Sequence, residues 1–209
     1  MSKEYEIKYF ELHGRAEPTR LCLWHAKADW QDTRVTGPAW MELKPTLPNG
    51  QVPVLVHKGH VLNESMAILR YVGKNLGYYP SDALEAWNVD QTIDFIADFL
   101  QFFGPPQMMG GINAESEAKF AECWEKIAAK LDKQLEGKTW LCNDKISIAD
   151  CTACFVVMSF VWNENMPAGA AWSDKAKAAI AKHPNFAKYC EHIKEEWKEW
   201  LESRPKCSL

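Results

Sequence analysis

Residues 5–26 read YEIKYFELHGRAEPTRLCLWHA, a strand pattern that a glycine separates from a helix pattern. From Tyr5 to Phe10, aromatic or aliphatic residues alternate with charged ones, which is typical of a half-buried strand. Gly14 interrupts this alternation, and from Arg15 to Ala28 the apolar residues recur at helical spacing. The stretch therefore predicts a strand followed directly by a helix.

The alternation of strands and helices continues to about residue 80. Trp30 to Val35 predicts a second strand, and Val52 to His57 is strongly β-prone. The turn Lys58-Gly59-His60 leads into a short strand at Val61-Leu62. Glu64 to Leu76 then carries apolar residues on one helical face. This order predicts a small α/β unit with a mixed sheet.

The second part of the chain shows only helical periodicity. Leu84 to Phe103 predicts one long helix that Gly104-Pro105-Pro106 closes. Apolar residues recur every three or four positions from Phe120 to Leu135 and from Phe186 to Leu201, and an apolar helical run spans Ile146 to Val161. This pattern is typical of a helical bundle. The predicted fold class is α/β followed by all-α, with a linker near Gly77-Tyr78-Tyr79-Pro80 and domains at 1–79 and 86–209.

The composition excludes several classes of protein. The net charge is −4, from 24 basic and 28 acidic side chains without a basic block, so nucleic acid is not expected as a main partner. No apolar run reaches the roughly 18 residues that predict a membrane-spanning helix, and the first ten residues lack the apolar core of a secretion signal. We expect a cytoplasmic protein that binds neither nucleic acid nor membrane.

Two local motifs are interpreted as structural. The chain has seven cysteines, an odd number that indicates reduced thiols. Cys151 and Cys154 form a C-x-x-C that suggests a redox dithiol or half a zinc site, but no second pair completes a zinc set and both lie in an apolar helical run. We predict no metal site. Ser147 and Asp150 match a Ser-x-x-Asp capping box, so Asp150 is interpreted as a folding residue.

This order of elements, with Tyr9-Phe10 and the following Gly14-Arg15-Ala16-Glu17, resembles a cytosolic glutathione S-transferase over nearly the whole chain. The motif is most similar to the sigma class, and the alpha and mu classes are close. The resemblance implies a thioredoxin-like domain at 1–79, with a four-stranded mixed sheet, that binds glutathione as a co-substrate. It also implies an all-helical domain at 86–209 that contributes a hydrophobic substrate pocket.

Two residues are candidates for activating the glutathione sulfur. The resemblance implies that the hydroxyl of Tyr9 donates a hydrogen bond to this sulfur. A free thiol with a pKa near 8.5 is only about 3% thiolate at pH 7, and lowering that pKa by about two units needs about 2.7 kcal/mol. Arg15, at the start of the following helix, is the candidate cation for the rest of this stabilisation. The alternatives are a packing role for Tyr9 and a solvated helix-start role for Arg15.

The segment Gln51-Val52-Pro53 matches the part of the family that pairs with the peptide backbone of glutathione. A proline between two β-prone runs removes a ladder hydrogen bond. A cis peptide bond at Val52-Pro53 explains the proline, because the turn then presents the N–H and C=O of Val52 to a ligand. An ordinary loop proline is the alternative.

Four further residues match the family's contacts to the two ends of glutathione. Ser65 opens a predicted helix whose N-terminus suits the γ-glutamyl carboxylate, and Glu64 would accept from the γ-glutamyl ammonium group. Close relatives usually carry Gln at the position of Glu64. The resemblance assigns Trp40 and Lys44 to the glycine end. The alternative for Glu64 and Ser65 is a plain helix start.

The resemblance also implies a homodimer in which Asp98 reaches across to the γ-glutamyl ammonium group bound by the partner. Asp90 and Asp94 share the predicted helix face with Asp98, so a solvated or metal-attracting acidic stripe is the alternative. For the hydrophobic substrate pocket we predict four residues, namely Phe10, Phe102, Pro105 and Thr152.

The resemblance implies a detoxification enzyme that conjugates the glutathione thiolate to hydrophobic electrophiles, with hydroperoxide reduction as a side activity. One alternative is a glutathione-dependent prostaglandin D synthase, an isomerase. Its pocket tryptophan would fall near Pro105, where this chain has Gly104-Pro105-Pro106, and this departure argues against the alternative. Another is a non-enzymatic crystallin-like or haem-carrying protein on the same fold. The retained binding residues argue against loss of the glutathione site: Tyr9, Trp40, Lys44 and Ser65.

Overall fold

A computed structural model describes residues 3–108, 113–142, 144–165 and 169–207, with the backbone alone for 104–108 and 169–170. The chain forms two compact units, residues 1–79 and 80–209, which are treated separately below. Among the helices of the described residues, none is both long enough and apolar enough to cross a membrane.

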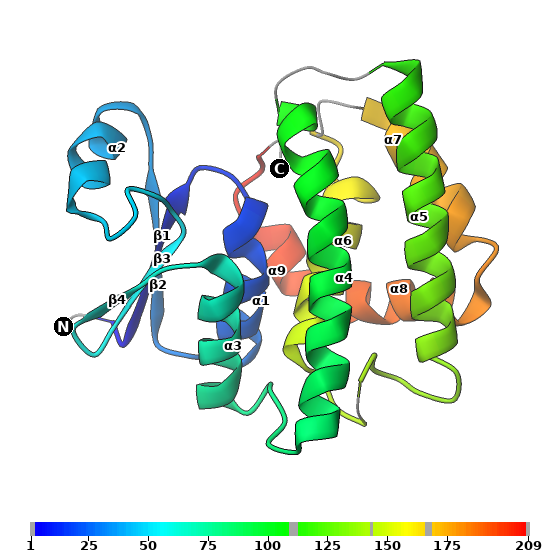
Figure 1. The fold of residues 1–209 in the computed structure, drawn as a ribbon, viewed down its shortest axis with the longest axis horizontal. Helices are drawn as coiled ribbons and strands as arrows, with labels where there is room; N and C mark the ends of the chain where they lie inside the picture. Colours follow the sequence, from blue (N-terminus) through cyan, green and yellow to red (C-terminus); the bar gives the residue numbers. More distant parts are fainter. Residues whose placement is uncertain (1–2, 109–112, 143, 166–168, 208–209) are drawn as a thin grey trace. The chain divides into compact units, whose positions relative to one another are not determined.

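The first unit is built on a sheet of four strands in the order β2-β1-β3-β4 (Figure 1). These are β1 (Tyr5–Phe10), β2 (Trp30–Val35), β3 (Val54–His57) and β4 (His60–Leu62). β1 runs parallel to β2 and antiparallel to β3, and β4 is antiparallel to β3. The mixed sheet confirms the prediction. β3 begins two residues later than expected, because Pro53 has no N–H to offer the ladder.

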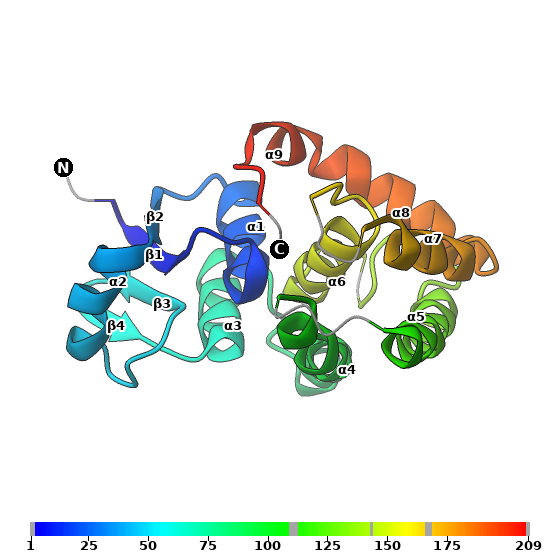
Figure 2. The same ribbon diagram turned by 90° about the horizontal axis from the view of Figure 1, so that it is seen from above.

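Two helices cover one face of this sheet. α1 (Glu17–His25) packs against α3 (Ser65–Leu76), whereas α2 (Gly37–Leu43) and the following 3-10 helix η2 (Lys44–Thr46) lie on the other face (Figures 1 and 2). The arrangement is thioredoxin-like, as expected. The predicted helix from Arg15 to Ala28 is shorter, because Gly14–Ala16 form a separate 3-10 turn, η1, and a left-handed Lys27 (φ 52°) follows the helix.

The second unit is all-helical and is centred on α6 (Ile148–Phe160), whose thirteen residues are all buried. Around it pack α4 (Ala83–Met108), α5 (Ala114–Gln134), α7 (Gly169–Ile180) and α8 (Pro184–Glu196), as Figure 2 shows, and the short α9 (Lys198–Ser203) follows. Asp150 accepts from the backbone N–H of Ser147 at 2.8 Å, which confirms the capping box.

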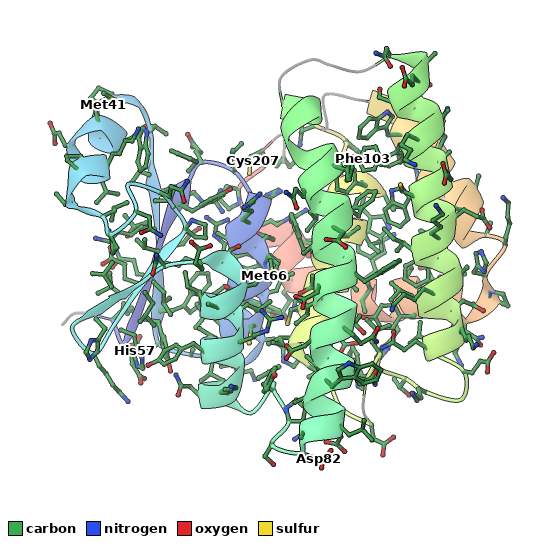
Figure 3. All side chains as sticks on the ribbon, in the orientation of Figure 1. Met41, His57, Met66, Asp82, Phe103 and Cys207 are labelled. Carbon is green, nitrogen blue, oxygen red and sulfur yellow. The ribbon has the colours of Figure 1, made fainter. Side chains whose placement is uncertain are left out.

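An aromatic cluster fills the space between α4, α5, α6 and α7. Phe103, labelled in Figure 3, lies with its ring centroid 5.4 Å from Phe120 and 5.6 Å from Trp172. Phe120 in turn stacks on Trp172 at 4.2 Å and lies 5.7 Å from Phe160. Rings at these separations gain about 0.5–1.5 kcal/mol per pair beyond the burial of their surface. This cluster ties the four helices into one core.

Two predicted helices in this unit have different boundaries in the structure, and one helix was not predicted. α4 continues through Gly104-Pro105-Pro106 to Met108, because proline holds φ at a helical value although it removes a hydrogen bond. The helix predicted from Phe186 to Leu201 is divided at Trp197 (φ −104°, ψ 21°) into α8 and α9. α7 was not predicted, since its alanine-rich sequence has few large apolar residues to mark a helical face.

Candidate active site

Tyr9 lies near the end of β1, and only 8% of it is exposed. Its hydroxyl oxygen accepts a hydrogen bond from the backbone N–H of Arg15 at 3.3 Å. Gly14 lies against the ring, since a Cβ added there would lie 2.7 Å from the Tyr9 hydroxyl oxygen, and its φ of +44° also favours glycine. The loop after β1 thus holds the Tyr9 hydroxyl through two consecutive residues.

The electrostatics of Tyr9 keep its hydroxyl protonated. Burial raises the pKa of Tyr9 above its ordinary value near 10, although the Arg15 N–H and the charges of Arg15 and Arg20 oppose this shift. A phenol in this state at neutral pH is a hydrogen-bond donor rather than a base. It is therefore suited to stabilising an anion that binds within hydrogen-bond distance of its oxygen.

A shallow hollow in the first unit collects most of the predicted binding residues. Arg15 is exposed at its edge, so the residue that bonds the Tyr9 hydroxyl also lines the hollow. The Val52-Pro53 peptide bond is cis, as predicted. Asn49 and Asn63 also line the hollow but were missed, because Asn49 belongs to no motif and Asn63 is only the start of a glycosylation sequon, Asn63-Glu64-Ser65, to which no function is assigned. The other lining residues are Gln51, Val52, Pro53, Glu64 and Ser65.

The start of α3 combines a helix N-terminus with an unusual backbone. Glu64 is the N-cap residue and adopts φ 67° and ψ 106°, a backbone conformation that residues other than glycine rarely adopt. Such a residue stores about 1–3 kcal/mol of strain and is typical of functional sites. The amide of Asn49 donates to the Glu64 carboxylate at 3.4 Å. Ser65 is the first residue of α3 and therefore lies at the helix N-terminus, which carries a partial positive charge.

Trp40 and Lys44 lie close together on α2 and η2. The Lys44 Nζ is 6.0 Å from the centre of the Trp40 ring, and Lys44 is exposed while Trp40 is half-buried. Phe10 meets the Trp40 ring edge-on at 4.9 Å. Phe10 was predicted for the hydrophobic pocket, and its described aromatic neighbours include Tyr9 at 5.6 Å. The first unit thus places an apolar ring directly beside the tyrosine.

The remaining predicted residues belong to the second unit. Asp98 and Phe102 are both exposed on α4. Thr152 is fully buried in α6, and its hydroxyl donates to the carbonyl of Ile148 at 2.9 Å, so it is a core residue. The side chain of Pro105 lies outside the described part of the structure.

Neither unit offers a metal site within the residues that the structure describes. No group of three or more His, Cys, Asp or Glu side chains is suitably placed there. Cys151 and Cys154 are both buried in α6, as their interpretation as structural residues predicts.

Two family models match the chain in tandem: the glutathione S-transferase N-terminal domain over residues 5–74 and the C-terminal domain over residues 94–204. Glutathione S-transferase 1 of Ascaris suum is 28% identical over 208 residues, which cover 97% of this chain and 98% of that protein. Human hematopoietic prostaglandin D synthase is 31% identical over 150 residues, 70% of this chain and 74% of the synthase.

A solved structure shows the same fold. The monomeric glutathione S-transferase Na-GST-3 of the hookworm Necator americanus superposes with a TM-score of 0.83 at 24% identity, over 99% of this chain and 100% of that chain.

Proposed function

The chain belongs to the glutathione S-transferase family, and we propose that this glutathione transferase joins the sulfur of glutathione to hydrophobic electrophiles by way of a thiolate that Tyr9 stabilises. The observation that carries this proposal is the protonated Tyr9 hydroxyl, linked through Arg15 to the hollow that collects the predicted glutathione residues.

The hollow suits the chemistry of glutathione. We propose that the Val52 backbone pairs with the cysteinyl unit, which a cis Val52-Pro53 bond leaves accessible. Ser65 and the N-terminus of the twelve-residue α3 would bind the γ-glutamyl carboxylate, and Glu64 would bind the γ-glutamyl ammonium group. Gln51 would add a polar contact at the edge of the hollow, where it is exposed.

The glycine end of glutathione would bind at α2 and η2. The exposed ammonium group of Lys44 would pair with the glycine carboxylate, and the indole N–H of Trp40 would donate to it. Phe10 and the exposed Phe102 are proposed to contact the electrophile. Thr152 is not retained for this role, because none of its side chain is exposed.

In the proposed reaction the enzyme binds glutathione, lowers the pKa of its thiol and orients it. A hydrogen bond from Tyr9 and the charge of Arg15 would supply about 2.7 kcal/mol, which makes most of the bound thiol a thiolate at pH 7. The thiolate then attacks the electrophilic carbon, and the leaving group departs with the bonding electrons. Reduction of hydroperoxides is a proposed side activity of the same thiolate.

The test compares Tyr9→Phe with Tyr71→Phe. Both variants lose a hydroxyl, but Tyr71 donates to or accepts from His57 at 2.8 Å near the opposite end of β1. We expect both to be retained on glutathione-agarose. Conjugation to a chloronitrobenzene at neutral pH should fall about 10–100-fold only in Tyr9→Phe. Retention of the unmodified protein without turnover would instead favour the carrier alternative, and equal rates in both variants would remove Tyr9 from the mechanism.

We further propose a homodimer in which the exposed face of α4 is covered. Leu84 and Trp87 are 72% and 62% exposed on this helix. Asp98 lies eleven residues after Trp87, three helical turns along, and is proposed to reach the partner's glutathione. Sedimentation should show a dimer at micromolar concentration and a monomer for Trp87→Glu. A monomer in the unmodified protein would remove Asp98 from the site.

A second candidate function is isomerisation of a prostaglandin endoperoxide. It is favoured by the 31% identity to human hematopoietic prostaglandin D synthase. Conversion of the endoperoxide at a rate comparable with conjugation would reverse the order of the two functions.

The sigma-class assignment is also proposed, and it rests on the motif Tyr9-Phe10 and Gly14–Glu17. A cytoplasmic location is proposed from the odd number of cysteines, seven, which indicates reduced thiols.

A further inference from the structure

Arg20 is a fully buried cation on α1 that none of the roles above uses. Its Nε donates to Asp32 Oδ1 on β2 at 3.0 Å, and its Nη1 lies 3.3 Å from Glu17 Oε2. Burying a guanidinium is expensive even when it is paired, and replacement by apolar groups is often neutral for stability. Stabilisation of the fold alone therefore does not explain the contacts of Arg20.

The other contacts of Arg20 converge on the loop that carries the active-site hydrogen bond. Nη1 donates to the carbonyl oxygen of Leu12 at 2.8 Å and to that of His13 at 3.0 Å. These carbonyls precede Gly14, where an added Cβ would meet the Tyr9 ring, and Arg15, whose backbone N–H donates to the Tyr9 hydroxyl. The guanidinium carbon also lies 5.7 Å from the centre of the Tyr9 ring. One side chain thus contacts both the tyrosine and the loop that holds it.

The charges around Arg20 favour a geometric role over an electrostatic one. Glu17 on α1 and Asp32 on β2 carry two negative charges, and Asp32 Oδ2 also accepts from Arg34 Nε at 2.8 Å. These two carboxylates offset much of the Arg20 charge, although that charge still opposes the rise in the pKa of Tyr9. The hydrogen bonds to the Leu12 and His13 carbonyls are a separate contribution of Arg20, because they fix the position of the loop.

We propose that Arg20 is a positioning residue for thiolate stabilisation, acting through the loop at Leu12 and His13 to hold Arg15 and Gly14 against the Tyr9 hydroxyl. The inference rests on the proposed function. Without these bonds the loop carbonyls turn to solvent and the Arg15 N–H leaves its place. Tyr9 then donates less well to the sulfur, whereas the residues that bind the rest of glutathione keep their positions.

The test uses Arg20→Lys, which keeps the charge. A single ammonium group cannot replace a planar fork that binds a carboxylate and two carbonyls together. We expect kcat to fall about 10-fold, KM for glutathione to change less than about 3-fold, and the titration midpoint of the bound thiol to rise by about one pH unit. Arg34→Met is the matched control, because it removes the other cation of Asp32, and it should keep the wild-type midpoint.

A second variant, Asp32→Asn, tests the inference if Arg20→Lys does not fold. Asp32→Asn keeps the shape of the side chain that Arg20 Nε binds but removes its charge. As in Arg20→Lys, kcat should fall, here about 3-fold, and the midpoint of the bound thiol should rise, here by about half a pH unit. The inference is overturned if Arg20→Lys keeps the wild-type kcat and thiol midpoint. It is also overturned if both variants lose stability while kcat and the thiol midpoint stay unchanged. A wild-type midpoint equal to that of free glutathione would instead overturn the proposed function itself.

Discussion

The contact between Gly14 and Tyr9 provides a sharp test of the active-site geometry, because Gly14→Ala leaves every catalytic group chemically intact. A Cβ at Gly14 would lie 2.7 Å from the Tyr9 hydroxyl oxygen and 2.8 Å from its Cε1. Both distances are shorter than van der Waals contact, so the buried ring must shift. The backbone adds strain, since alanine at a φ of +44° is about 1–2 kcal/mol less favourable than glycine.

Crowding and backbone strain together set the stability loss expected for Gly14→Ala. Crowding in a packed site costs about 1–3 kcal/mol, which with the backbone strain predicts a loss of about 2–5 kcal/mol in the free energy of unfolding. Displacing the hydroxyl should also lower the conjugation rate about 10–100-fold at neutral pH.

Gly59→Ala is the matched control for this prediction. Gly59 has a φ of +79°, but a Cβ there would meet nothing within 4 Å. It should show the backbone strain of about 1–2 kcal/mol and a wild-type rate. The assays are urea unfolding and initial conjugation rates on the same preparations. If Gly14→Ala matches Gly59→Ala in stability and the wild type in rate, the contact with Tyr9 has no functional consequence.

Two further predictions concern the helical unit. Asp150 accepts from the N–H of Leu141 and of Ser147 and from the hydroxyls of Ser147 and Tyr189, all within 3.0 Å, so Asp150→Ala should lose about 3–5 kcal/mol of stability in urea unfolding. A loss below about 1 kcal/mol would contradict the proposed cap. Burial raises the pKa of Cys142 and of Cys190 to about 12, so both lack the reactive thiolate at pH 8. A maleimide followed by mass mapping should modify them only after unfolding, and rapid labelling in the folded protein would contradict this.

Much of the fold could be predicted from local patterns. The alternation at Tyr5–Phe10, the break at Gly14 and the helical spacing after it define a strand and a helix without tertiary information. The cis bond at Val52-Pro53 was predictable because a proline between β-prone runs has few other solutions. α7 was not, because its burial depends on the aromatic cluster around Trp172 rather than on its own periodicity.

The candidate site was only partly predictable for the same physical reason. Tyr9, Arg15 and Ser65 belong to motifs, so the sequence alone predicts them as site residues. Arg20 acts through Asp32 and two loop carbonyls that meet only after folding, and nothing in its spacing marks these contacts. Glu64 was expected at a helix start, but its positive φ follows from the turn that leads into α3.

The central claim is that this chain converts bound glutathione to its thiolate. The most direct measurement is the ultraviolet absorbance of the thiolate as a function of pH, recorded for the wild-type protein saturated with glutathione and for free glutathione. The account predicts a midpoint about two units below the free thiol's value near 8.5. A bound midpoint equal to that of free glutathione would contradict the account.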